Sequence, residues 1–263
     1  MGNADERKEA LEKLMSMRAE LAISHAFSGI KIDEDKALQL LKNRDDNNIS
    51  ELDKAIRDRL VAAVDNLSEF AVCEEYQLYQ DIVEIDADAE EEGVDFDNEG
   101  LVDEYYARCK KYNDEYALVE NEDIEYALEI AGQYAELSKD TIITYFTQND
   151  DRVRPWHFAL QGFSAKRDDF PAWMIPPIEW ACRCYLIASD DVRGSVQASG
   201  LDIQKVYAKT PKKPKELDDV FSESVARCGR IFGKSHRYFK VKKKDKKWLS
   251  EVVERIRSEY YGK

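Results

Sequence analysis

Apolar side chains recur at helical spacing through most of the first 140 residues. A first stripe, which includes one arginine, consists of Leu11, Leu14, Met15, Arg18, Leu21 and Ala22. A second stripe consists of Leu52, Ile56, Leu60, Val64, Leu67 and Ala71. Because residues at this spacing share one face of an α-helix, both stripes predict amphipathic helices. No proline occurs before Pro155, so these helices are expected to be long and joined by short links.

Two positions in this half carry helix-start signals. Ser50, with Asp53 three residues later, resembles a capping box in which aspartate replaces the usual glutamate or glutamine. Asn121 is predicted to be the N-cap of a further helix, because an asparagine side chain accepts hydrogen bonds from first-turn N–H groups.

The pattern changes after residue 140. All six prolines lie there, and three of the four tryptophans fall between residues 150 and 185, which is typical of a turn-rich segment. Residues 141–147 and 184–188 are rich in β-branched and aromatic side chains and are predicted to be strands. Residues 205–215 are expected to form a basic linker, and residues 216–228 a helix. An extended piece is expected at 230–241 and a last helix at 246–260.

The predicted fold class is α+β, mostly α. An acidic helical interaction region over residues 1–140 would precede a small mixed α/β core over 141–204 and a basic α+β extension over 205–263. Residues 1–150 hold 39 acidic and 15 basic side chains, whereas the remaining residues hold 15 acidic and 24 basic ones. Such a split predicts that the two parts of the chain meet different partners.

Composition argues against several classes of protein. No apolar run approaches the roughly 20 residues of a membrane-spanning helix, so no membrane partner is expected. The start of the chain lacks the basic and apolar regions of a secretory signal. The five cysteines are odd in number and favour a reduced, cytosolic setting. The acidic stretch at 86–99 fails the EF-hand pattern, because Glu91 and Asp97 stand where glycine and glutamate are required.

The segment from Tyr145 to Tyr185 carries the most specific pattern. Its blocks consist of Thr147, Asp150, Asp151, Arg152, Val153, Arg154, Pro155 and His157, then Ala159, Leu160 and Gly162, then Pro176, Pro177, Trp180, Cys182, Arg183 and Cys184. In order and spacing this segment resembles the Mu F-like minor head proteins, the phage head morphogenesis family. Tyr145 stands where that family often has tryptophan, and Gln161 where aspartate or asparagine is common. Residues 229–232 and 236–239 show a second, weaker resemblance to some phage head proteins.

The resemblance implies an assembly protein of the phage head rather than an enzyme. Its expected partners are the portal protein and other capsid or scaffold proteins, together with non-specific double-stranded DNA. Its expected location is the virion, in the head interior or at the portal vertex, after assembly in the host cytoplasm. No cofactor is expected apart from the zinc ion considered next.

His157, Cys182 and Cys184 form a candidate metal site, because zinc takes imidazole nitrogen and thiolate ligands. Asp151 or Cys228 could supply a fourth ligand. In the alternative interpretation both cysteines pack as small apolar residues, and His157 hydrogen-bonds a loop carbonyl. A cysteine–histidine nucleophilic pair is a third interpretation, although no oxyanion-binding segment is recognisable. A disulfide between Cys182 and Cys184 would be strained.

Arginines and aspartates alternate around this motif, namely Arg152, Arg154, Arg183, Asp150, Asp151, Asp168 and Asp169. Because arginine pairs bidentately with carboxylates, internal ion pairs that fix the loops are the favoured interpretation. In the alternative, the arginines face DNA phosphates or an acidic partner. The tryptophans of the segment and Phe170 are expected to belong to the core rather than to a binding surface.

The tail is basic, with 15 basic and 5 acidic side chains over residues 205–247. Its densest cluster consists of Lys240, Lys242, Lys243, Lys244, Lys246 and Lys247. Such clusters neutralise phosphates and release counterions, so these lysines are predicted to contact DNA non-specifically. In the alternative, they pair with the acidic half of the same chain.

The runner-up function is a phage-encoded effector with a small nuclease or toxin domain after Tyr185. Some members of the resembling family carry such domains fused to the core. His236, Arg230 and Lys234 would then be the acid–base and phosphate-binding groups.

Overall fold

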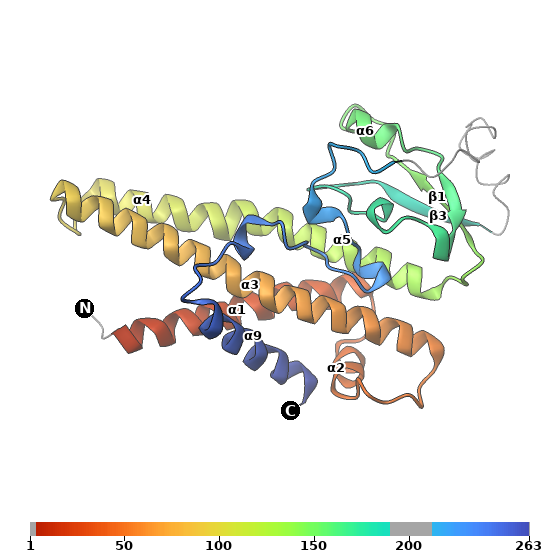
Figure 1. Cartoon of the computed structure of the whole chain (residues 1–263), viewed down its shortest axis with the longest axis horizontal. Helices are drawn as coiled ribbons and strands as arrows, with labels where there is room; N and C mark the ends of the chain where they lie inside the picture. The colour runs from red at the N-terminus through yellow and green to blue at the C-terminus, as the bar shows by residue number, and fades with distance from the viewer. Residues whose placement is uncertain (1–3, 190–211, 263) are drawn as a thin grey trace.

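In the computed structural model the fold is mostly helical with one small sheet, which confirms the predicted α+β class (Figure 1). The structure describes residues 4–189 and 212–262. The predicted basic linker at 205–215 lies largely outside these residues, and so does the predicted boundary at residue 204. Within the described ranges, no helix combines the length and the apolar character that crossing a membrane requires.

A long helical hairpin forms the frame of the molecule. The first arm, α3 (Glu51–Glu92), is roughly 63 Å long at 1.5 Å per residue. The chain then returns through α4 (Glu99–Lys110), the π-helix η1 (Lys111–Tyr116) and α5 (Ala117–Glu136) (Figure 1). The acidic stretch at 86–99 forms the end of α3, a turn and the start of α4, so it lies at the tip of the hairpin.

The two helix-start predictions had different outcomes. Ser50 caps α3 as predicted, because its Oγ accepts a hydrogen bond from the Asp53 N–H at 3.0 Å. The prediction for Asn121 is wrong. This residue lies inside α5, which continues η1 without a break, so the N–H groups around it already have helical partners.

α1 (Ala4–Ile30) and α9 (Lys246–Tyr261) pack on one side of the hairpin, with α2 (Glu34–Lys42) beside the base of α3 (Figure 1). Apolar side chains of α1, α3 and α9 form a continuous seam, which consists of Leu11, Met15, Ala19, Ala71, Val72, Tyr76, Leu249, Val252, Val253 and Ile256. The last helix is therefore confirmed, and it is anchored to the N-terminal helices.

The predicted apolar face of α1 is wrong in part. Leu11, Met15 and Ala22 are buried, but Leu14 and Leu21 are 49% and 51% exposed. Because α1 packs against both α3 and α5, its buried face is displaced toward Ala19, Ile23, Ala26, Phe27 and Ile30. Two apolar leucines are consequently left on the surface.

α1 and α5 lie in close contact at Gly29. A Cβ atom at this position would lie 2.2 Å from the Glu125 carbonyl oxygen, so only glycine fits without moving the backbone. This contact sets the two helices side by side.

The small sheet lies over α5 (Figure 1). β1 (Ile142–Phe146) is its central strand and pairs antiparallel with both β2 (Ser164–Lys166) and β3 (Tyr185–Ser189). The strands predicted near 141–147 and 184–188 are thus confirmed, whereas β2 was not predicted.

The tail departs from its prediction. Residues 216–228 contain no α-helix, and only the 3-10 turns η4 (Asp219–Phe221) and η5 (Val225–Arg227). The Asp218 side chain accepts a hydrogen bond from the Val220 N–H, and the Ser224 side chain accepts one from the Ala226 N–H. Such bonds stabilise turns and compete with the formation of a helix.

The predicted extended piece at 230–241 is interrupted by the 3-10 turn η6 (Arg237–Phe239). The Asn66 side chain on α3 pairs with the backbone of Ile231 and Phe232, in the place where a neighbouring strand would bond.

One hydrophobic cluster joins all three predicted segments. Its buried members include Phe70, Tyr145, Ile178, Phe232 and Tyr238. The helical hairpin, the sheet region and the tail therefore share a core, and the predicted segment boundaries remain predictions.

Candidate functional site

The motif residues His157, Cys182 and Cys184 come together in the structure. His157 Nδ1 lies 3.3 Å from Cys184 Sγ and 3.9 Å from Cys182 Sγ, and the three donor atoms all lie within 4.8 Å of one another. All three side chains are buried. The histidine belongs to the short helix α6 (Pro155–Phe158), whereas the cysteines precede β3, so the cluster joins two separate loops.

Glu179 and Arg154 orient the His157 ring. Glu179 Oε2 lies 3.1 Å from His157 Nε2 and 3.1 Å from Arg154 Nε. Because a carboxylate accepts hydrogen bonds, this contact assigns the ring proton to Nε2 and leaves the Nδ1 lone pair facing the thiols. Sequence reasoning missed Glu179, although its position three residues before Cys182 in the same motif block was a signal.

The two thiols also interact with each other. A hydrogen bond from Cys182 lowers the pKa of Cys184, and the same hydrogen bond, together with burial, raises the pKa of Cys182. Burial, and then the nearby Cys184 thiol, raise the pKa of Tyr145, whose hydroxyl lies in the interior beside this cluster. On the α5 side, the Tyr126 hydroxyl donates to the Cys184 carbonyl oxygen at 2.5 Å.

The two residues predicted as a fourth ligand lie elsewhere, so that prediction is wrong. Asp151 and Cys228 are exposed, and neither belongs to the cluster. Over residues 4–189 and 212–262, His157, Cys182 and Cys184 form the single group of histidine, cysteine and acidic side chains with metal-binding geometry. The cysteines are all free, so Cys182 and Cys184 form no disulfide.

The arginines of the motif make internal ion pairs, as the favoured interpretation predicted. Arg183 binds Asp150 through two parallel contacts of 2.9 Å. Arg154 pairs with Glu179 and also donates to the Trp180 carbonyl oxygen at 2.9 Å. Arg152, by contrast, is exposed.

Other motif residues shape the loops around the cluster. Gly162 has a φ of +83° at the turn into β2, a conformation that favours glycine. The peptide bond between Pro176 and Pro177 is cis. The predicted core aromatics pack into the main hydrophobic cluster, with Phe170 buried and Trp156, Trp173 and Trp180 partly buried.

The six lysines predicted to contact DNA are all exposed, and they lie at residues 240–247, before and in the first turn of α9. In the described part of the chain, Lys247 is the one of the six that contacts a carboxylate, Glu251, at 3.8 Å. Lys242 donates to the neutral Gln80 side chain at 2.5 Å. The alternative, in which the basic tail is a solvated surface that pairs with the acidic half, therefore holds for Arg230, which binds Glu69, but not for these six lysines.

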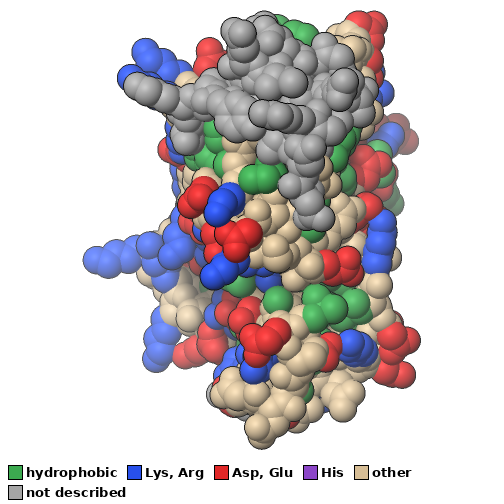
Figure 2. All heavy atoms as spheres, turned by 90° about the vertical axis from the view of Figure 1, so that its right-hand side faces the viewer, with side chains coloured by type: hydrophobic (Ala, Val, Ile, Leu, Met, Phe, Trp, Pro, Cys, Tyr) green, Lys and Arg blue, Asp and Glu red, His purple; other side chains and the backbone are tan. Residues whose placement is uncertain are grey.

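The arginines of the tail behave differently from the lysines. Arg230 binds Glu69 of α3 at 2.8 Å, and Arg255 binds Glu12 of α1 at 2.7 Å. Arg230 and Arg255 thus attach the tail to the acidic helices. Five of the six lysines at 240–247 have no carboxylate partner in the described part of the chain. Figure 2 shows the face at the sheet end of the molecule, where acidic and basic side chains are interspersed. The acidic first half and the basic second half of the sequence therefore do not form separate charged areas on this face.

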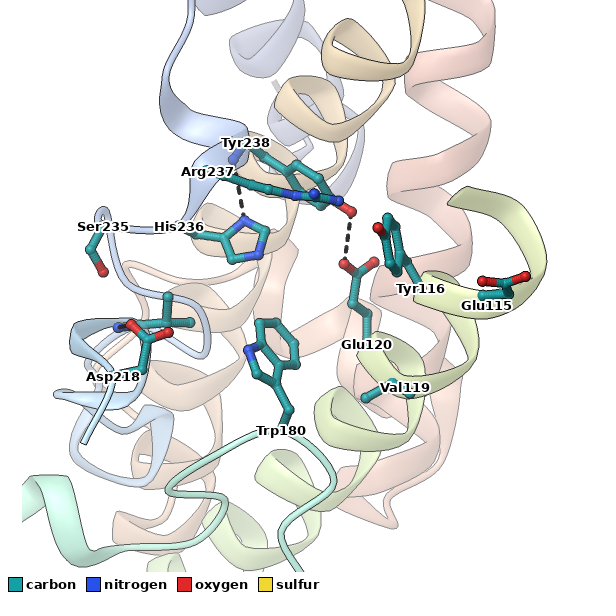
Figure 3. Close-up of a pocket in the computed structure, with 11 residues that line it drawn as sticks. Glu115, Tyr116, Val119, Glu120, Trp180, Asp218, Ser235, His236, Arg237 and Tyr238 are labelled. Atoms are coloured by element: carbon teal, nitrogen blue, oxygen red, sulfur yellow. Dashed lines mark hydrogen bonds between the residues drawn. The ribbon is translucent and has the colours of Figure 1, made fainter. Parts of the chain in front are cut away.

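A cavity of about 510 Å³ opens between α5, the Trp180 loop and the tail (Figure 3). The Tyr238 hydroxyl donates to Glu120 Oε1 at 3.0 Å on its wall. Burial raises the pKa of Glu120 to about 7 and raises that of the neighbouring Glu74 as well. Burial lowers the pKa of His236 to about 4, so this histidine is neutral at pH 7.

The three residues that a nuclease would use in the alternative function, His236, Arg230 and Lys234, do not come together in this cavity. His236 lines it, but Arg230 is paired with Glu69 and Lys234 is exposed. The neutral His236 ring packs between aromatic side chains, with centroid distances of 4.3 Å to Tyr238 and 5.1 Å to Phe70. This is the environment of a core histidine.

Comparison with known proteins gives one match. The model of the family described as Phage Mu protein F like protein matches residues 47–187, which is more than half of the chain and includes the whole motif segment. No curated protein and no solved structure matches.

Proposed function

The chain belongs to the Phage Mu protein F like family, and from this membership we propose that it acts at the portal vertex of a phage head. The family is one of structural proteins of head morphogenesis, so capsid proteins are its partners and the virion is its destination. In our proposal the helical half binds the portal protein or a neighbouring capsid or scaffold protein. The lysine cluster faces the packaged DNA, and assembly takes place in the host cytoplasm.

The free charge of the lysine cluster is the observation that carries the DNA contact. Five of its six lysines make no ion pair in the described ranges, although the chain has a net charge of −15. Exposed charges are screened within about 10 Å at 0.1 M salt, so the local cluster rather than the net charge governs a contact with phosphate. Binding of this kind is independent of sequence and weakens as salt rises.

We expect the full chain to bind double-stranded DNA at low salt, and the triple variant Lys243→Gln, Lys244→Gln, Lys246→Gln to bind it more weakly. The slope of log affinity against log salt is negative, at about −0.9 per phosphate contact, so the loss of three contacts should make it less negative by about 3 units. Fluorescence anisotropy over a salt series measures this slope.

A matched control removes three exposed lysines elsewhere, in the variant Lys13→Gln, Lys110→Gln, Lys139→Gln. This variant has the same net charge and should keep the original slope. An equal loss in both variants, or no binding by the original chain at 50 mM salt, would contradict the DNA contact.

An exposed apolar stripe on α1 supports the protein contact. Leu14, Met17 and Leu21 are 49%, 55% and 51% exposed and recur at helical spacing. Leu118 of the neighbouring α5 is 61% exposed. A stripe of this kind fits an apolar groove on a partner, as helices do when they bind in grooves.

We expect the double variant Leu14→Asp, Leu21→Asp to lose co-purification with the co-expressed portal protein at least tenfold. A charge placed in an apolar interface must be desolvated, and a tenfold loss corresponds to about 1.4 kcal/mol. The control Leu52→Asp changes a leucine of α3 that is 42% exposed and should leave binding unchanged. Full retention of the portal protein by the double variant would exclude this stripe as the contact.

The effector alternative receives less support. It needs an assembled acid–base and phosphate site, and His236, Arg230 and Lys234 do not converge. We therefore propose a non-enzymatic role.

A further inference from the structure

We propose that His157, Cys182 and Cys184 bind a zinc ion that joins the two loops of the motif segment. Zinc bonds of about 2.3 Å to sulfur and about 2.0–2.1 Å to imidazole nitrogen place these atoms roughly 3.6 Å apart in a tetrahedral site. The observed distances from His157 Nδ1 to the two sulfur atoms, 3.3 and 3.9 Å, lie on either side of that value. The donor set is thus already spaced for one ion.

The contact with Glu179 supports this assignment. Histidines that bind metals usually donate their second ring N–H to a carboxylate or a carbonyl, which fixes the ring and makes the ligating nitrogen more basic. His157 has this arrangement, with Nε2 3.1 Å from Glu179 Oε2 and Nδ1 directed at the thiols. Arg154 holds the same carboxylate oxygen from its other side at 3.1 Å.

In the competing interpretation, both cysteines pack as apolar residues and the His157 ring hydrogen-bonds a loop carbonyl. That interpretation predicts a carbonyl oxygen next to a ring nitrogen of His157. Among the described residues, the His157 ring nitrogens contact the two thiols and Glu179, and neither of them bonds a carbonyl oxygen. Two thiols and one imidazole that converge in a buried space select zinc over magnesium or calcium, which prefer oxygen ligands.

The fourth coordination position has a candidate beside it. The hydroxyl of Tyr145 is buried beside the Cys184 thiol. Structural zinc sites usually have four protein ligands, whereas sites with three, as in zinc enzymes, hold a water molecule in the fourth position. We assign the Tyr145 hydroxyl to a hydrogen bond with that water.

The ion would stabilise a part of the fold that has little regular structure. Between β1 and β3, the described chain has only the four-residue α6, the three-residue β2 and two 3-10 turns. A metal bound to folded but not to unfolded chain stabilises the fold by mass action. The inference does not rest on the proposed function, because it concerns the chain's own loops.

Elemental analysis of the full chain, purified without chelator and dialysed against trace zinc, tests the proposal. We expect about one zinc ion per chain. Cobalt substitution should give the visible bands of a tetrahedral site together with near-ultraviolet thiolate-to-cobalt absorption. The double variant Cys182→Ser, Cys184→Ser should lose both signals, whereas Cys109→Ser, at a half-buried cysteine outside the cluster, should keep them.

A milder variant separates metal binding from folding. Glu179→Gln leaves all three ligands in place and should weaken zinc affinity roughly 10–100-fold, with the thiolate-to-cobalt absorption retained. The proposal is overturned if the original chain holds no zinc after incubation with one equivalent, or if its cobalt form lacks thiolate absorption. Retention of zinc by the double cysteine variant would overturn it too.

Discussion

Arg18→Met should lower the free energy of unfolding by about 3–5 kcal/mol, the usual cost of breaking a buried ion pair on one side. Arg18 of α1 lies 2.8 Å from Glu74 and 2.6 Å from Glu75, both on α3, and donates to Asn113 at 2.5 Å. Its side chain is 13% exposed, and those of the two glutamates are 4% and 8% exposed. Methionine would fill the space but leave the carboxylates without a cation.

The cost should depend on pH. Burial raises the pKa of both Glu74 and Glu120, the latter to about 7, and Arg18 opposes this rise. A carboxyl with a raised pKa favours folding most below its ordinary pKa of 4.5, and this contribution is lost as pH rises through about 7. Removal of Arg18 raises the pKa of both groups further, and protonation relieves the unpaired charge more readily at pH 5 than at pH 8, so the destabilisation should be larger at pH 8.

Urea denaturation at the two pH values measures both effects. Arg255→Met is the matched control, because Arg255 also binds a glutamate of α1 but is 52% exposed. Its partner Glu12 keeps a hydrogen bond from Trp248, so a loss of at most about 1 kcal/mol is expected. Equal losses in the two variants would show that burial of the Arg18 pair is energetically irrelevant.

Asn66→Ala should lower the free energy of unfolding by about 3 kcal/mol, since each buried polar group left unpaired costs about 1–3 kcal/mol. Asn66 is 2% exposed. Its Oδ1 accepts hydrogen bonds from the N–H groups of Ile231 at 2.7 Å and Phe232 at 2.8 Å, and its Nδ2 donates to the Phe232 carbonyl oxygen at 3.1 Å. Alanine removes all three hydrogen bonds and leaves the two N–H groups unpaired, whereas the Phe232 carbonyl oxygen keeps a bond from Arg230 Nε at 3.1 Å.

The loss should be concentrated in the tail. Phe232 stacks on Phe70 with ring centroids 4.3 Å apart, so release of its backbone loosens the contact between α3 and residues 229–239. Hydrogen exchange should therefore accelerate at the Ile231 and Phe232 amides before it does in α1. Gln77→Ala is the control, because this half-buried amide also binds the tail backbone, at Tyr238 and Lys240, but from a position open to water. Similar effects of the two variants would contradict the argument from burial.

Local signals in the sequence were sufficient for the motif and for several elements. The strand at 141–147, the Ser50 cap and the helix at 246–260 were predicted because their side-chain pattern and capping chemistry act over a few residues. The grouping of His157 with Cys182 and Cys184 came from their residue types and from the resemblance of the motif. The structure then brought the three donors together across a separation of 25 and 27 residues.

Other features depended on which elements meet in space. The apolar stripe of α1 wrongly predicted that Leu14 and Leu21 are buried. α1 packs against both α3 and α5, and the positions of these two neighbours, rather than the spacing of apolar residues in α1, determine which side chains are buried. The path of residues 230–241 also depends on tertiary contacts, because Asn66, more than 160 residues away, binds the backbone of Ile231 and Phe232.

The sequence by itself determined the helical character of the first half, the basic cluster of the tail and the chemistry of the histidine–cysteine motif. These properties follow from short-range periodicity, charge and residue type. Only the tertiary structure decided that Arg230 and Arg255 pair with glutamates of the acidic helices while the lysines of the 240–247 cluster do not, and that Glu179 orients His157. Such pairings depend on distances between segments far apart in the chain, and those distances exist only once the shared core has formed.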